Sequence, residues 1–223
     1  MRRRLLLFVL AVLSLPALAL AAGTDPKEQI NPVDQRKAAS IVLKRTDFAA
    51  GWKQVPNAPD SGEDPNCPGY KPDQSDLVLT GEAEANFTGD PSRLTSYSNV
   101  FKTKGDALAS WTRSVKPALA PCIARVLKQA IEKQGGKAVI VKQGQIAFPK
   151  VAPRTAAYRV VINVSYTQAG KTTTVPFTLH VIAVGNGRGD ASLVTFGLGN
   201  GIPGADLRAF AKLLAVRLAA AKL

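Results

Sequence analysis

The sequence predicts an α+β fold in which a single antiparallel sheet of about six strands is covered by three helices and stapled by one disulfide. Three observations lead to this prediction: segments whose apolar residues alternate with polar ones, segments whose apolar residues recur at helical spacing, and two cysteines. These segments follow one another as helix, two strands, helix, four strands and helix. That order favours a sheet covered mainly on one face.

The first residues are typical of a secretory signal peptide. Arg2–Arg4 form a basic region, Leu5–Leu15 an apolar region and Ala19–Ala21 a small-residue cleavage site. We therefore expect residues 1–22 to direct export, or to remain as an uncleaved anchor, and residues 23–223 to form a single extracytoplasmic domain with an ordered core from about residue 32. No later segment has the ~20 apolar residues of a spanning helix. This predicts a secreted or cell-envelope protein that is peripheral to membrane or wall at most.

The domain is expected to begin with a helix and a long loop. Asn31 as N-cap and Pro32 at the first helical position start a helix that runs to about Thr46. Frequent prolines then exclude a helix or a central strand from Lys53 to about Ser75. Acidic residues gather in this loop (53–76), namely Asp60, Glu63, Asp64, Asp73 and Asp76. The loop is either solvated or a cation site, although its spacing matches no EF-hand pattern.

The two cysteines are Cys67, in the acidic loop, and Cys122. Outside the cytoplasm the two are expected to form one intramolecular disulfide. A catalytic or redox thiol pair is the alternative, but such pairs favour C-x-x-C spacing or a partner histidine, and neither is present.

A hairpin and a long helix are predicted next. Alternation from Leu77 to Phe87 and from Leu94 to Lys102 indicates two antiparallel strands. Thr103 then caps an amphipathic helix that continues to Gly135-Gly136 and that Pro117 and Pro121 should kink or divide.

Four strands and a closing helix complete the predicted fold. The strands cover Ala138–Phe148, Thr155–Thr167, Thr172–Val184 and Ala191–Leu198, and one face of the sheet is expected to be solvated. His180, the one histidine, is expected to face solvent or to be satisfied by a neighbour. The last helix starts after Pro203-Gly204.

The net charge of +13 favours an anionic partner, although charge of this size also serves solubility. Basic residues lie away from the apolar stripe of the long helix and are predicted to form an anion-binding face, or simply a solvated one. They are Arg113, Lys116, Arg125, Lys128 and Lys133. Nucleic acid is not expected, because no zinc spacing, RNA-stacking motif or separate basic recognition segment accompanies the charge.

The residues that enzymes need are missing from the sequence. It contains no nucleophile elbow, no phosphate-binding glycine loop and no set of metal ligands. We therefore expect no catalytic residues, no metal and no cofactor. A carboxylate pair, Glu82 and Glu84, keeps acid–base hydrolysis of an envelope polymer as a third hypothesis.

The segment from Ser98-Asn99-Val100-Phe101 through Ala109-Ser110-Trp111 to Cys122 completes a layout that covers about Ile41–Leu223. This layout resembles the PknH-type extracellular sensor domains of actinobacterial kinases and their stand-alone secreted relatives, and it is similar in element order to LpqN-type lipoproteins. The sensor domains usually carry two disulfides, whereas this chain allows one. The resemblance implies a ligand groove between sheet and helices and no catalysis.

In this chain such a groove would be bordered by the long helix and the solvated sheet face and would include Tyr97, Phe101 and Trp111, although a Trp on the apolar stripe is more typical of a core residue. Together these observations predict an exported, non-enzymatic, sensor-like domain. Its ligand would be an envelope-associated small molecule, lipid or anionic polymer. A carrier of lipids or apolar metabolites is the alternative.

Overall fold

The structure is a computed structural model that describes residues 25–57 and 67–223. The expected signal peptide lies outside the described residues, and so do Asp60, Glu63 and Asp64 of the acidic loop. No helix in the described ranges is long and apolar enough to cross a membrane.

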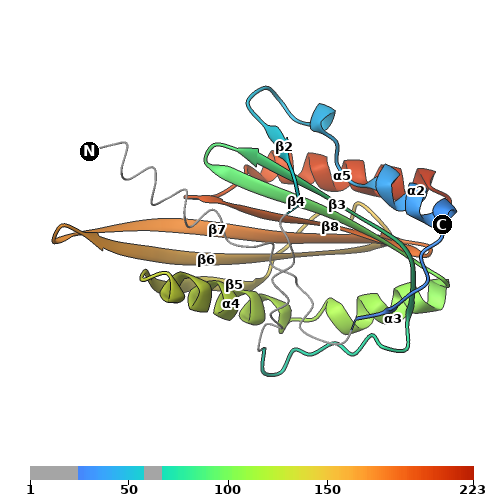
Figure 1. Cartoon of the computed structure of the whole chain (residues 1–223), viewed down its shortest axis with the longest axis horizontal. Helices are drawn as coiled ribbons and strands as arrows, with labels where there is room; N and C mark the ends of the chain where they lie inside the picture. The colour runs from blue at the N-terminus through green and yellow to red at the C-terminus, as the bar shows by residue number, and fades with distance from the viewer. Residues whose placement is uncertain (1–24, 58–66) are drawn as a thin grey trace.

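Eight strands of the described chain form one sheet in the order β1-β3-β4-β8-β7-β6-β5, with β2 paired to β3 off this path. The strands are β1 (Lys27–Glu28), β2 (Lys53–Val55), β3 (Val78–Gly89), β4 (Ser92–Phe101), β5 (Lys137–Gln145), β6 (Arg154–Gln168), β7 (Lys171–Asn186) and β8 (Gly189–Leu198). All neighbours are antiparallel except β1, which runs parallel to β3. The β6–β7 hairpin extends beyond the other strands (Figure 1).

The expectation of about six strands was therefore too low, and the sheet is mostly rather than wholly antiparallel. The two additional strands, β1 and β2, are only two and three residues long. Segments this short show no period that sequence analysis could detect. β2 lies in the segment expected to be a loop, and it pairs with β3 alone.

Four α-helices are present in the described chain instead of three, since the long predicted helix is two. The helices are α2 (Pro32–Ile41), α3 (Lys104–Ser114), α4 (Leu119–Lys133) and α5 (Gly204–Ala220). Pro117 lies between α3 and α4, where its ring and missing N–H break the helical hydrogen bonds. Pro121 falls in the first turn of α4, where no intrahelical N–H bond is required.

Helix α2 ends earlier than the expected Thr46. Ile41, Val42 and Leu43 are all buried, and three consecutive residues cannot share one helix face. The chain therefore becomes extended at Val42, and the Leu43 N–H donates to Ser96 Oγ at 3.1 Å. A short 3-10 helix, η1 (Arg45–Asp47), follows.

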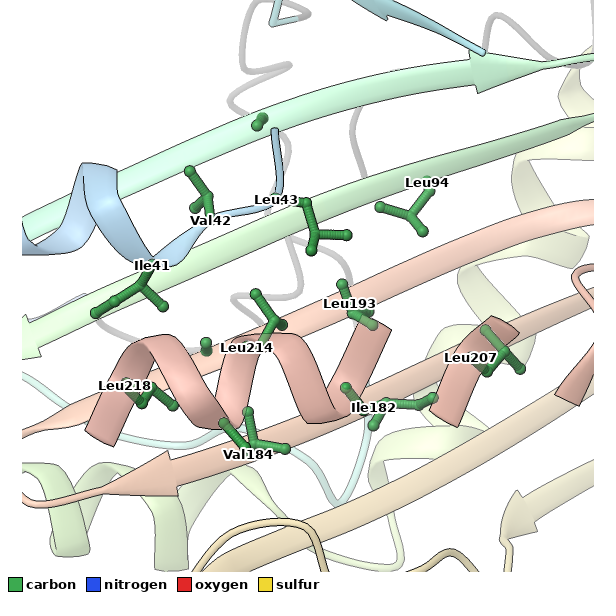
Figure 2. Packing of buried hydrophobic residues seen from close by; sticks show 14 of the residues in the cluster. Ile41, Val42, Leu43, Leu94, Ile182, Val184, Leu193, Leu207, Leu214 and Leu218 are labelled. Carbon is green, nitrogen blue, oxygen red and sulfur yellow. The ribbon is translucent and has the colours of Figure 1, made fainter. Parts of the chain in front are cut away.

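Helices cover both faces of the sheet, which corrects the expectation of a sheet covered mainly on one face. α2 and α5 lie on one side and α3 and α4 on the other (Figure 1). Figure 2 shows Leu207, Leu214 and Leu218 of α5 packed over Ile182 and Leu193 of the sheet. On the α2/α5 face of β7, Thr178, His180, Ile182 and Val184 are buried, whereas Thr172, Thr174 and Pro176 near the hairpin are exposed.

The opposite face of the sheet carries two separate apolar clusters. Ile123 and Leu127 of α4 pack with Tyr158 and Val160 of β6 in the larger cluster. The smaller cluster joins Phe101 at the end of β4 to Ala107 of α3 and to two leucines of the β3 region. The interruption between α3 and α4 lies between these clusters, and that arrangement positions the cavity described next.

Candidate functional site

A cavity of ≈ 510 Å³ lies between the α3/α4 side of the structure and strands β3, β4, β7 and β8. Four aromatic side chains line it: Tyr70, Tyr97, Phe101 and Trp111. Leu119, at the start of α4, and Val181 of β7 add aliphatic surface. Both the volume and the aromatic lining are within the range of small-molecule sites.

The strand register explains why the sheet leaves room here. One cross-strand row places Tyr97 of β4 beside Ser192 of β8 and Ala183 of β7. The side chains of Ser192 and Ala183 are too small to reach the helices, so a gap remains over this part of the row. The cavity therefore follows from small residues at matching positions in neighbouring strands.

The adjacent row holds an ion pair that crosses a strand. Arg154 of β6 and Asp190 of β8 both pair in register with Gly185 of β7. Arg154 Nη2 donates to Asp190 Oδ1 at 2.8 Å, above Gly185. A Cβ on Gly185 would collide with both side chains, so glycine is required for the contact. Burial raises the pKa of Asp190 to about 6, and the bond from Arg154 opposes this rise.

Trp111 joins this ion pair to the cavity. The Arg154 guanidinium lies 5.8 Å from the centre of the Trp111 ring, within the range of a cation–π interaction. Trp111 is only half-buried and also packs against the α4 cluster. The ring therefore serves both as part of the core and as part of the cavity wall.

The disulfide fixes another part of the wall. Cys67 and Cys122 are bonded, with their Cα atoms 5.1 Å apart, so the expected pairing is confirmed. Tyr70 follows in a turn in which its N–H donates to Cys67 O at 2.9 Å. Its hydroxyl donates to Ser114 O, at the end of α3, at 2.8 Å. Burial raises the pKa of Tyr70 and of Tyr97, so both phenols are neutral donors at physiological pH.

All three residues expected at a groove, Tyr97, Phe101 and Trp111, line this one cavity. The helix-covered face supplies it, not a solvated face. Several lining residues had no signal in the sequence, including Tyr70, Asp190 and Ser192. Their positions depend on the disulfide and on strand register, which periodicity within one strand does not specify.

The predicted basic residues do not lie on one helix. Arg113 is on α3, where its two Nη atoms bond Asp76 and it also donates to Asp73 O at 2.7 Å. Lys128 of α4 pairs with Glu132 one turn along. Lys116 lies between the helices, and Arg125 and Lys133 are exposed on α4. None of these five residues lines the cavity.

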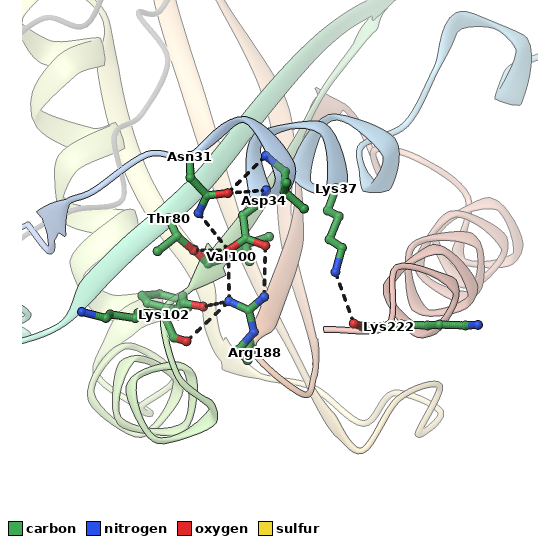
Figure 3. A network of polar contacts seen from close by, with 10 residues as sticks. Asn31, Asp34, Lys37, Thr80, Val100, Lys102, Arg188 and Lys222 are labelled. Carbon is green, nitrogen blue, oxygen red and sulfur yellow. Dashed lines mark hydrogen bonds and ion pairs between the residues drawn. The ribbon is translucent and has the colours of Figure 1, made fainter.

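A separate polar cluster holds α2 on the sheet (Figure 3). Arg188, in the β7–β8 turn, donates from Nη2 to Asp34 Oδ1 at 3.0 Å and from Nη1 to Asp34 Oδ2 at 3.1 Å. Thr80 Oγ1 donates to Asp34 Oδ2 at 2.7 Å. The bonds from Arg188, followed by that from Thr80, lower the pKa of Asp34 to about 2 against the opposing effect of burial. The cluster links α2 to β3 and to the β7–β8 turn, and none of Asp34, Thr80 and Arg188 lines the cavity.

His180, which was expected to face solvent or to be hydrogen-bonded by a neighbour, is buried instead. Its side chain is only 6% exposed, and Nδ1 has no hydrogen-bond partner among the described residues. Burial, with a contribution from Arg159, lowers the pKa of His180 to about 4. In the described ranges, no group of three or more His, Cys, Asp or Glu residues is arranged to hold a metal ion.

No protein-family model matches the chain, and no curated protein matches it. A comparison with solved structures finds the extracellular domain of PknH from Mycobacterium tuberculosis. The two chains are 10% identical, with a TM-score of 0.43, and the match covers 86% of this chain and 98% of that one. At these values the match is a distant structural resemblance that identifies neither a ligand nor an activity.

Proposed function

We propose that this protein is an extracytoplasmic, non-enzymatic binding protein that holds a small molecule in the cavity beneath α3. The carrying observation is the cavity itself, ≈ 510 Å³ in volume and lined by Tyr70, Tyr97, Phe101 and Trp111. Aromatic rings offer a large contact area with few rotatable bonds, and Tyr hydroxyls and backbone groups can orient a ligand.

The disulfide supports the proposed location. Disulfides persist in oxidising compartments and are rare in the cytosol. Combined with the basic and apolar regions of residues 1–22, the Cys67–Cys122 bond supports export of residues 23–223 as one domain. Release into the medium and retention in the envelope both agree with this proposal.

Native mass spectrometry of the protein purified from an exporting host tests the proposal. We expect a co-purifying small molecule on the wild type and its loss from Ala183→Phe, because the new ring would fill the space over the Tyr97–Ser192–Ala183 row. Ser192→Leu fills the same space less severely and serves if Ala183→Phe does not fold. The matched control is Val161→Phe on β6, which is half-exposed and does not line the cavity.

An unliganded wild type, or a molecule retained equally by Ala183→Phe and Ser192→Leu, would contradict the proposed site. The chemistry of the recovered molecule also decides between the main proposal and a carrier of lipids or apolar metabolites, since a carrier would release a purely apolar compound.

A further inference from the structure

The charged residues that line the cavity are all acidic. They are Asp25, Glu28, Glu82 and Asp190, and no lysine or arginine among the described residues lines it. Asp190 is paired with Arg154. Asp25, Glu28 and Glu82 form no ion pair with any residue in 25–57 or 67–223. All three carboxylates are exposed, so the solvent-facing part of the cavity wall is negative, in a protein whose formal net charge is +13.

The sheet places Glu28 and Glu82 on neighbouring strands at the β1/β3 edge, and Asp25 lies just before β1. Glu28 of β1 pairs in register with Leu79 of β3, and Glu82 follows three residues later on β3. Glu82 also pairs with Asn99, which separates Tyr97 and Phe101 on β4. Burial raises the pKa of Glu82, and the charges of Glu28, Asp25 and Glu84 raise it further. The carboxylates repel one another, and a bound cation would relieve that repulsion.

Two strands from Glu82 in the same cross-strand row, Asp190 already has a cation beside it. There the Arg154 guanidinium neutralises Asp190 and lies over the Trp111 ring. A ligand would therefore meet the exposed carboxylates, the aromatic rings and a neutral ion pair. A metal ion does not explain this arrangement, since the described acids form no metal-binding group.

We infer that the ligand is a small organic cation, a primary or quaternary ammonium compound whose charged group lies beside Glu82, in the field of Glu28 and Asp25, and whose apolar body lies against Phe101, Tyr97 and Trp111. Carboxylates combined with aromatic rings are how proteins recognise such cations. This inference rests on the proposed function, and it names the chemistry of the ligand. It also implies that the net positive charge of the protein does not describe its binding site.

Three probes that share a phenyl ring and a two-carbon chain test the inference: phenethylammonium, 2-phenylethanol and 3-phenylpropionate. We expect protein-detected NMR titrations of the full exported protein to give the lowest dissociation constant for the cation and the highest for the anion. Glu82→Gln should weaken binding of the cation about fivefold, as for one partly exposed charge pair, and leave binding of the alcohol unchanged. Glu132→Gln, the same change on α4 outside the cavity, should alter neither.

The outcomes separate the inference from the proposed function. If the three probes bind equally, and Ala183→Phe weakens all three, the cavity is a binding site but the inferred charge preference is wrong. If the cation does not bind, or binds equally well to Glu82→Gln, the inference is overturned. The proposed function would then still be decided by the molecule that co-purifies.

Discussion

Two Asp–Arg ion pairs show how burial decides how much an ion pair contributes to the stability of the fold. The Asp34 and Arg188 side chains are 9% and 23% exposed, whereas those of Asp76 and Arg113 are 63% and 34% exposed. The first pair lies among α2, β3 and the β7–β8 turn and is bonded further by Thr80. Removal of one partner of a buried ion pair leaves the other charge buried without a counter-charge. Water screens the charges of an exposed pair, so its loss costs little.

Asp34→Asn should therefore destabilise the fold by about 3 kcal/mol, because Arg188 would keep its charge in a mostly buried place. Urea unfolding at pH 7 measures this free energy. Asp76→Asn is the matched control and should leave the free energy of unfolding unchanged within error. Equal effects of the two substitutions would show that the Asp34 cluster does not hold α2 as described.

His180 should make the fold sensitive to mild acid. Its pKa is about 4 in the folded protein, below the ordinary value of about 6.5 in an unfolded chain. Between these values the unfolded state binds a proton that the folded state does not, so stability falls as the pH falls from 6.5 to 4.

In His180→Gln, the loss of unfolding free energy between pH 7 and pH 4.5 should be smaller than in the wild type by up to about 2 kcal/mol. The difference between the two proteins isolates His180, since all other titrating groups are shared. Urea unfolding at both pH values measures it. Identical pH dependence in wild type and variant would mean that His180 is not buried in neutral form.

At the scale of elements, the disulfide connects two segments that share no strand pairing. Cys67 and Cys122 are separated by 55 positions, and the bond ties the turn that carries Tyr70 to the first turn of α4. Tyr70 reaches α3 as well, through Ser114. The disulfide therefore supports both the fold and one wall of the cavity.

Replacement of both cysteines, Cys67→Ser with Cys122→Ser, should lower the free energy of unfolding by about 4 kcal/mol, the chain-entropy value for a loop of this length. Because Tyr70 lines the cavity, we also expect weaker binding of the co-purified molecule. Urea unfolding and a titration of the folded variant test the two effects separately. An unchanged unfolding midpoint would contradict the stabilising role.

Element types were largely predictable, and element ends were not. Period-two alternation was sufficient for β3, β4 and the four C-terminal strands, because each is at least nine residues long. The end of α2 was not predicted because it depends on tertiary packing. Three consecutive residues, Ile41, Val42 and Leu43, are all buried, and a helix cannot bury all three on one face. The strands β1 and β2 exist only because β3 offers them an edge.

At the scale of the whole molecule, the helices divide between the two faces of the sheet and perform different tasks. α2 and α5 seal one face over a continuous apolar core, as Figure 2 shows. α3 and α4 cover the other face incompletely, because Pro117 separates them. The incompletely covered face is the one that contains the cavity, so the interruption that separates α3 from α4 also leaves room for the candidate site.

The site was predictable only in part for a related reason. Tyr97, Phe101 and Trp111 could be named from alternation and helical spacing. Ala183 and Ser192 leave the space, and Gly185 makes room for the Arg154–Asp190 pair beside it. Their importance appears only when β6, β7 and β8 are placed in register. The acidic character of the cavity was hidden as well, because composition reports the charge of the whole surface.

The most direct measurement is amide chemical-shift mapping on the isotope-labelled exported protein, stripped of its co-purified molecule and then titrated with it. We expect the largest shift changes at Tyr97, Phe101, Trp111 and Ser192, with little change on the outer surface of α4 or in α5. Changes centred on Arg125 and Lys128 of α4, with none at the cavity residues, would contradict the proposed site.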